Sequence, residues 1–124
     1  MKIYFIYVTF GNVKEAKKMG GLLVNKKLAA CTNILPSIYS TYIWNNKIQN
    51  DKEYSMIVKT SKSKVKKAIQ YIVKHHSYDC PAVSAFPIEF THKDFQNGLL
   101  RKLEIKNTNM INRQLFEVWS ILLL

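Results

Sequence analysis

The chain has 124 residues, 48% of them hydrophobic, and a formal net charge of +11 at pH 7. This length predicts a single domain whose core needs no disulfide or metal to stabilise it. Seventeen of the nineteen basic residues are lysines, whereas base readout and bidentate phosphate binding favour arginine. The composition therefore argues against sequence-specific nucleic-acid binding. It predicts only a non-specific attraction to anions.

The first 25 residues predict a strand followed by a helix. Lys2–Phe10 is rich in Ile, Tyr, Phe and Val, which is typical of a buried strand. Asn12, with Glu15 three positions later, resembles a capping box, and the helix that it begins should run to about Asn25. Gly20-Gly21 lowers the helix propensity, and we expect a close approach of helix to sheet in return. The predicted apolar face of the helix consists of Ala16, Met19, Leu23 and Val24.

The next segment predicts a long hairpin. Leu28–Leu35 should be a second strand, with a bend at Pro36 and a continuation over Ile38–Trp44. Asn45-Asn46 can adopt positive φ angles and form a tight turn. Lys47–Thr60 is then a third strand that, if continuous, spans about 46 Å at ~3.3 Å per residue.

Such a hairpin is too long for the body that carries it. A compact domain of this size has a radius of gyration of only about 14 Å, so the hairpin must project beyond it. Its open strand edges and its apolar side chains Ile38, Tyr42 and Trp44 would then need cover from another subunit. The alternative is a hairpin that bends sharply at Pro36 and folds against its own body.

The second half predicts a helix, a strand and a short helix. Ser61 or Ser63 should cap a helix that ends near His75-His76, and Pro81 should open a strand over Ala82–Phe90. A helical turn follows around Asp94–Leu103. The apolar stripe of the longer helix consists of Val65, Ala68, Ile69, Ile72 and Val73.

The order of elements is β-α-β-β-α-β, which predicts an α+β, ferredoxin-like fold. We assign residues 1–105 to this domain and residues 106–124 to an apolar C-terminal extension that is too short to be a transmembrane helix. No stretch resembles a signal peptide, and Cys31 and Cys80 are too few for a disulfide framework. We therefore expect a cytoplasmic protein with reduced thiols and no membrane partner.

General enzyme motifs do not appear in the sequence. The four glycines form neither a P-loop nor a dinucleotide fingerprint, so no organic cofactor is expected. The fold alone leaves open a small acylphosphatase-like enzyme, although that chemistry needs an arginine-bearing phosphate loop and Gly11–Val13 contains no arginine. A non-specific nucleic-acid-binding module also stays open.

Several short blocks follow one another along about residues 4–96. They are Val8-Thr9-Phe10 with Glu15-Ala16, Leu28-Ala29-Ala30-Cys31-Thr32-Asn33-Ile34 with Pro36, Ser40-x-Tyr42-x-Trp44, Glu53, Val58-Lys59-Thr60 and His76-x-Tyr78-x-x-Pro81. Together, and in this order, they resemble the CutA divalent-cation-tolerance family. The chain departs from the family's pattern in the hairpin, where Asn46 replaces the usual glycine, and in the closing block, where Phe95, Gln96 and Gly98 replace a Tyr-Leu-x-Trp pattern.

The resemblance implies a non-catalytic binding protein for divalent-cation tolerance. It implies a homotrimer, similar to the PII signalling proteins, with metal or small-ligand sites in clefts between subunits. The candidate cleft residues carried over from the resemblance are Cys31, Trp44, Glu53, Lys59 and Tyr78. The alternative is that these residues only build the subunit interface.

The adjacent imidazoles of His75 and His76 are a candidate site for Cu(II) or another divalent cation, because imidazole suits copper. Some family members combine such a pair with a cysteine on the first strand, where this chain has Val8. The alternatives are a solvated histidine at the helix end for His75 and a partly buried, hydrogen-bonded residue for His76.

Overall fold

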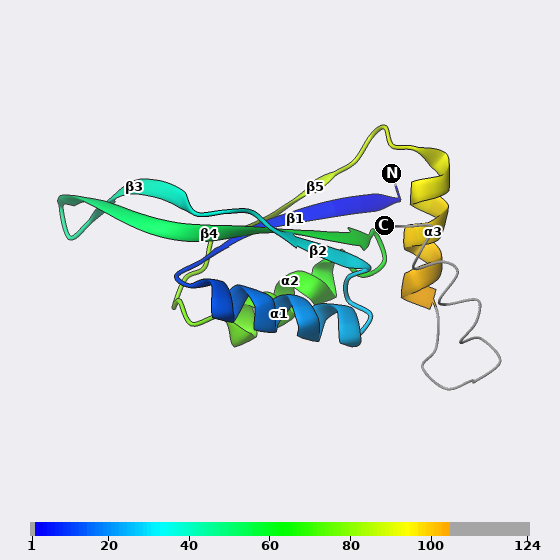
Figure 1. Cartoon of the computed structure of the whole chain (residues 1–124), viewed down its shortest axis with the longest axis horizontal. Helices are drawn as coiled ribbons and strands as arrows, with labels where there is room; N and C mark the ends of the chain where they lie inside the picture. The colour runs from blue at the N-terminus through cyan, green and yellow to red at the C-terminus, as the bar shows by residue number, and fades with distance from the viewer. Residues whose placement is uncertain (1, 105–124) are drawn as a thin grey trace.

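The computed structural model describes residues 2–104 (Figure 1). The predicted order of elements is confirmed, and the helical turn predicted around Asp94–Leu103 is a helix of 12 residues. The elements are β1 (Ile3–Phe10), α1 (Val13–Asn25), β2 (Cys31–Ile34), β3 (Ile38–Trp44), β4 (Lys47–Ser61), α2 (Val65–His75), β5 (Val83–Pro87) and α3 (Lys93–Glu104).

The strands form one antiparallel sheet in the order β2-β4-β1-β5, with β3 paired to the first half of β4. This is the ferredoxin-like arrangement, in which β1 and β4 are central. Helices α1 and α2 lie on the same face of the sheet, and α3 lies at the end of the molecule opposite the β3–β4 tip (Figure 1). The other face of the sheet is therefore covered only in part.

The core follows the period-two alternation of β1. Ile6, Val8 and Phe10 are fully buried and pack in the cluster that contains the inner faces of α1 and α2. Ile3 belongs to a second, smaller cluster that contains Leu99 of α3. Val8 is thus a core residue, and a side chain at this position faces the helices.

The hairpin projects as the sequence predicts. β4 has 15 residues, about 50 Å at ~3.3 Å per residue, and its first half pairs only with β3. We call residues 38–53 the arm. Asn45 and Asn46 form its turn with φ angles of 51° and 61°. Large apolar side chains on the arm are exposed: Tyr39 (85%), Ile43 (73%), Trp44 (63%) and Ile48 (71%).

The second strand is shorter than predicted. It begins at Cys31 rather than Leu28, because the end of α1 continues into a tight turn. Lys27 adopts a φ of 61°, and the backbone N–H groups of Leu28 and Ala29 both donate to the carbonyl of Leu23. These residues are bonded to the helix and are not free to join the sheet.

The predicted serine caps of the second helix are wrong. Ser61 is the last residue of β4 and its hydroxyl lies 3.0 Å from that of Ser63, so neither serine caps α2. The N-cap is Lys64, without a side-chain hydrogen bond.

The last strand is also shorter than predicted, because β5 ends at Pro87 and not at Phe90. Val24 of α1 and Val73 of α2, which were predicted to lie on the buried apolar faces of these helices, are 38% and 47% exposed.

The two helix glycines differ in what surrounds them. A Cβ on Gly20 would lie 2.7 Å from Thr32 Oγ1 on β2, which confirms the close approach of α1 to the sheet. A Cβ on Gly21 would meet nothing within 4 Å, so the prediction of a close approach to the sheet is wrong for that residue.

The predicted extension 106–124 lies outside the described residues. Within residues 2–104, no helix is long and apolar enough to cross a membrane.

Candidate functional site

A groove of about 520 Å³ lies between the arm, the end of β1 and the loop that follows α2. Its walls are mostly polar and aromatic, and three of its side chains are carboxylates. The groove is lined by Thr9, Tyr42, Trp44, Gln49, Asp51, Glu53, Tyr78, Asp79, Cys80 and Ala82.

Two tyrosines in the groove donate hydrogen bonds to carboxylates on β4. The Tyr78 hydroxyl donates to Glu53 Oε2 at 2.9 Å, and the Tyr42 hydroxyl donates to Asp51 Oδ2. Burial, followed by the hydrogen bond to Glu53, raises the pKa of Tyr78 well above its usual value. The hydrogen bond to Asp51 raises the pKa of Tyr42 as well. Both hydroxyls are therefore held protonated, as donors.

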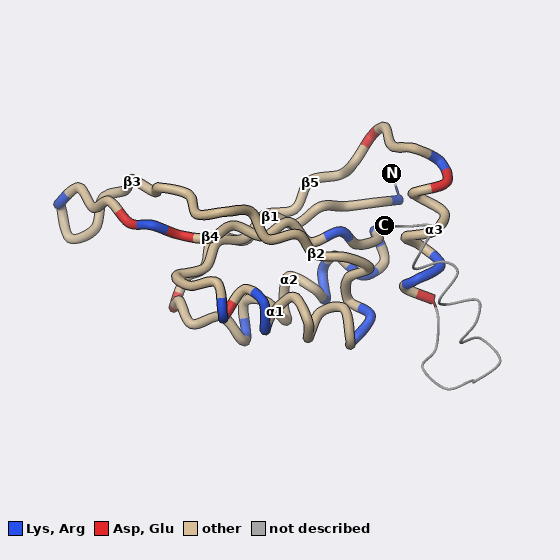
Figure 2. The backbone as a smooth tube through the Cα atoms, in the orientation of Figure 1, with Lys and Arg blue, Asp and Glu red and all other residues tan. Residues whose placement is uncertain are grey.

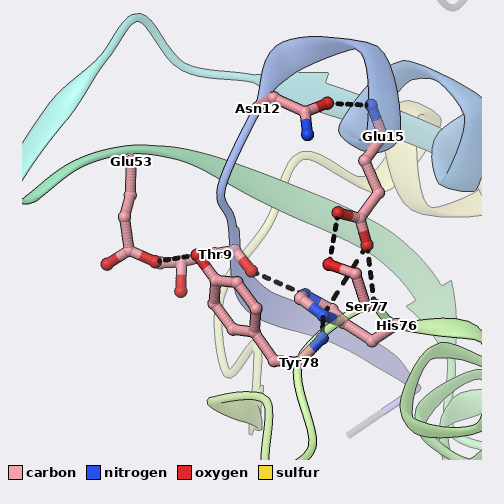
Figure 3. A network of polar contacts seen from close by, with 7 residues as sticks. All are labelled: Thr9, Asn12, Glu15, Glu53, His76, Ser77 and Tyr78. Atoms are coloured by element: carbon pink, nitrogen blue, oxygen red, sulfur yellow. Dashed lines mark hydrogen bonds and ion pairs between the residues drawn. The ribbon is translucent and has the colours of Figure 1, made fainter.

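His76 fixes the loop that carries Tyr78. Its Nε2 donates to the carbonyl of Thr9 at 2.8 Å, and its Nδ1 accepts from the backbone N–H of Tyr78 at 3.0 Å (Figure 3). This pair of bonds assigns the neutral Nε2–H tautomer. The ring stacks on Phe10 with centroids 4.7 Å apart.

Glu15 holds the same loop from α1. Its carboxylate accepts from the backbone N–H of Ser77 at 2.9 Å and from the Ser77 hydroxyl at 2.7 Å (Figure 3). At the same time the backbone N–H of Glu15 donates to Asn12 Oδ1, so the predicted cap is confirmed. The carboxylate that would complete a capping box is used for the loop instead. The groove wall is thereby fixed to both β1 and α1.

The groove is acidic although the chain is strongly basic. Asp51 and Asp79 are exposed and Glu53 is half-buried, and Cys80 beside them has an exposed thiol. Carboxylate oxygens bind hard cations, and a thiolate binds softer ones. Figure 2 shows the acidic residues on the middle of β4. The arrangement favours a cationic ligand, with Tyr42 and Trp44 as aromatic walls.

The structure brings together three of the five predicted ligand-binding residues. Trp44, Glu53 and Tyr78 line the groove. Cys31 and Lys59 face each other across the β2–β4 ladder instead, and Lys59 is six residues, about 20 Å, along β4 from Glu53. The Lys59 ammonium lies 5.6 Å from the ring centroid of Phe5 and 5.5 Å from that of Phe95. Within one chain it contacts α3 and does not reach the groove.

The two histidines point in different directions. His75 is the last residue of α2; it is exposed, its ring lies 4.3 Å from that of Tyr71, and it lines a smaller groove of about 270 Å³ that also contains Glu15 and Ser77. His76 is the C-cap with extended backbone, and its ring turns into the core. Among residues 2–104, no group of three or more His, Cys, Asp or Glu side chains is arranged around a metal position.

Sequence reasoning missed the groove residues Gln49, Asp51, Asp79 and Cys80. For Asp51 a signal exists: it is two residues before Glu53 on one strand, so both side chains share a face. Because Ser40 opposes Asp51, Tyr42 is the diagonal neighbour of Asp51 across the hairpin. Asp79 and Cys80 are on a loop that is fixed by tertiary hydrogen bonds of His76, Ser77 and Tyr78, which the sequence pattern does not indicate.

The family described as CutA1 divalent ion tolerance protein matches residues 4–100. This chain belongs to that family. Its CutA relatives include the divalent-cation tolerance protein CutA of Archaeoglobus fulgidus, which is 42% identical over 100 residues, 81% of this chain and 97% of that protein. The chloroplastic CutA 1 of Oryza sativa is 40% identical over 104 residues, 83% of this chain and 55% of that protein.

Solved CutA structures share the fold. CutA1 from Ehrlichia chaffeensis superimposes with a TM-score of 0.81 at 30% identity, covering 85% of this chain and 99% of that one. The periplasmic divalent cation tolerance protein CutA from A. fulgidus superimposes with a TM-score of 0.78 at 37% identity, covering 82% and 98%. The chain thus spans nearly all of these two CutA chains but about half the length of its plant relatives.

Proposed function

We propose that this chain is a non-catalytic, homotrimeric binding protein for divalent-cation tolerance. It captures Cu(II) or another divalent cation in the acidic groove, which a neighbouring copy completes. The observation that carries the proposal is that Asp51, Glu53 and Asp79 line one groove in a chain of net charge +11. Because these three carboxylates are not gathered around one metal position within the described residues, a neighbouring copy has to complete the site. A protein with this net charge repels cations overall, so a local acidic groove is where a cation would bind.

The exposed arm supports the proposed homotrimer. Trp44, which lines the groove, is 63% exposed, and Ile43 beside it is 73% exposed. On the sheet face away from α1 and α2, Tyr7 and Phe86 are 37% and 45% exposed. Neighbouring copies that cover the arm and this face would bury these side chains and satisfy the open edge of β3.

A neighbouring copy also offers a place for the two remaining predicted ligand residues. Cys31 and Lys59 lie near the end of the sheet opposite the arm tip. In a closed ring of subunits, one copy's arm can extend along the next copy's sheet, so Cys31 and Lys59 of one copy would border the groove of another. The five residues would then form one shared cleft.

The histidine pair is a second candidate metal site. His75 is exposed beside the carboxylate of Glu15 and is the accessible ligand of the pair. His76 would have to give up its hydrogen bond to Thr9 or to Tyr78 before it could bind a metal. This cost favours the groove as the stronger site.

Titration calorimetry with Cu(II) separates the two sites. We expect Glu53→Gln to weaken Cu(II) binding at least tenfold, whereas His75→Ala leaves the stronger site unchanged. Glu89→Gln is the matched control, because Glu89 is exposed outside the groove and the charge change is the same. If His75→Ala abolishes binding and Glu53→Gln does not, the histidine pair is the site. Unchanged binding in both variants would reject both sites.

The absence of catalysis and the cytoplasmic location are parts of the same proposal. The raised pKa of Tyr78 argues against a phenolate nucleophile in the groove. Cys31 and Cys80 are unpaired, which is typical of a reducing compartment. We expect no turnover of an acyl phosphate by the purified chain, and measurable release of phosphate above the rate in buffer would contradict this.

A further inference from the structure

The positive charge of this chain is concentrated on one layer of the fold. Residues 12–27 and 62–76, which comprise α1, α2 and their ends, contain ten lysines and one acidic residue. They carry nine of the eleven net positive charges, whereas the rest of the chain has nine basic and seven acidic residues. Figure 2 shows lysines along α1 and α2 and acidic residues on the arm.

The lysines within α1 and α2 are exposed, whereas the opposite sides of both helices are buried against the sheet. The one acidic residue of the layer, Glu15, is engaged by Ser77. We call the exposed lysines the lysine face. It consists of Lys14, Lys17, Lys18, Lys26, Lys62, Lys66, Lys67 and Lys74.

The positive charges of the lysine face destabilise the two helices that carry them. Lys66 and Lys67 lie in the first turn of α2, which has no acidic residue and no side-chain cap, so they face the positive end of the helix dipole. Lys14 and Lys18 are a like-charge pair at i and i+4 on α1. An anion bound at this face would relieve both repulsions, since a helix N-terminus with lysines beside it attracts phosphate.

We propose that the lysine face binds the phosphate backbone of double-stranded nucleic acid without reading its sequence. α1 is about 20 Å long at 1.5 Å per residue. Over about 20 Å, a duplex carries roughly twelve phosphates at one charge per ~1.7 Å, and about half of them face one side. The eight exposed lysines match this charge density, and lysine binds phosphate as a point charge without base readout.

Two other anionic partners fit the face less well. Stable membrane binding needs an apolar signal besides charge, and the exposed apolar side chains on these helices are only the small Val13, Val24 and Val73. A protein partner needs buried aromatic or arginine anchors, whereas lysine is depleted in such interfaces.

Fluorescence anisotropy with a labelled duplex of about 20 base pairs of mixed sequence tests the proposal. For about six phosphate contacts, affinity of the full chain should fall on the order of 10³-fold between 50 and 200 mM salt. Replacing four lysines of the face by glutamine should weaken binding at 50 mM and reduce this salt effect to about tenfold. The four are Lys14, Lys18, Lys66 and Lys67, all exposed.

A matched variant removes the same charge elsewhere and should keep the full salt effect. Its glutamine substitutions are at Lys2, Lys47, Lys52 and Lys93, all exposed. Equal losses in both variants would mean that net charge alone attracts the duplex, and the proposal would be wrong. Tighter binding to vesicles containing phosphatidylserine than to the duplex, at equal salt, would identify a membrane surface instead. Cu(II) binding at the groove should be unchanged in the variant of the lysine face, whose four lysines lie outside the groove and the arm, so this result is independent of the proposed metal function.

Discussion

The hydrogen bond between Tyr78 and Glu53 joins the loop after α2 to the arm, and its energetic contribution can be worked out. The Tyr78 hydroxyl lies 2.9 Å from Glu53 Oε2, and both side chains are half-buried. A hydrogen bond to a charged group contributes about 1.5–3 kcal/mol net. Because the groove is open to water, which can replace the lost partner, we expect the lower end. Tyr78→Phe should therefore cost about 1.5 kcal/mol of the free energy of unfolding.

A double-mutant cycle isolates this bond. Tyr78→Phe, Glu53→Gln and the double variant are unfolded in urea at one chain concentration, because the proposed subunit association would make stability concentration-dependent. We expect a coupling energy of about 1 kcal/mol. Tyr39→Phe is the control; Tyr39 is 85% exposed, and its loss should change stability by less than about 0.5 kcal/mol. Additive effects within about 0.3 kcal/mol would refute the assignment of the bond as the link.

Three further predictions follow from single contacts. Gly20→Ala should be less stable than Gly21→Ala by about 1–3 kcal/mol in urea unfolding, because only the first adds a Cβ against Thr32; equal stabilities would contradict the close approach. The free energy of unfolding should fall as pH rises above about 10, since unfolded Tyr78 then loses a proton that the folded state retains. Tyr78→Phe should make that fall shallower, and an identical pH profile would argue against it. Lys67→Glu should stabilise α2 by about 0.3–1 kcal/mol through the helix dipole, measured by thermal unfolding, and destabilisation would contradict the repulsion described there.

The parts of the fold that depend on local patterns were predictable from the sequence. Strand Ile38–Trp44 and the turn at Asn45 follow from β-propensity and from the tolerance of asparagine for positive φ. The serine caps failed because β4 continues through Ser61, and strand length is set by pairing with β1. The start of β2 was misplaced because Lys27 adopts a conformation usually left to glycine or asparagine, and Leu28 and Ala29 then bond to the end of α1.

The candidate site was predictable only where the family resemblance supplied it. Glu53 and Tyr78 are 25 residues apart and meet because His76 fixes the loop against β1. His75 and His76 are adjacent in sequence, yet the helix ends between them and turns one ring outward and the other into the core. These contacts depend on where each helix and strand ends in the folded structure. The periodicity of the sequence does not give those positions.

The distribution of positive charge over the surface also could not be predicted from the sequence alone. Composition alone predicts a generally soluble, basic surface. The apolar faces of α1 and α2, once packed on one side of the sheet, place ten of the seventeen lysines on a single layer. The asymmetry between this layer and the acidic groove becomes visible only when both helices are placed on the fold (Figure 2).

We propose that copies of this chain join through their arms and bind a cation in the groove that each junction completes. Native mass spectrometry of the full chain, titrated with Cu(II), reports both quantities in one spectrum. We expect a species of three 14.5 kDa chains that gains one ion per chain at the lowest Cu(II) concentrations. A single 14.5 kDa chain at micromolar concentration, or a trimer that gains no ion, would contradict it.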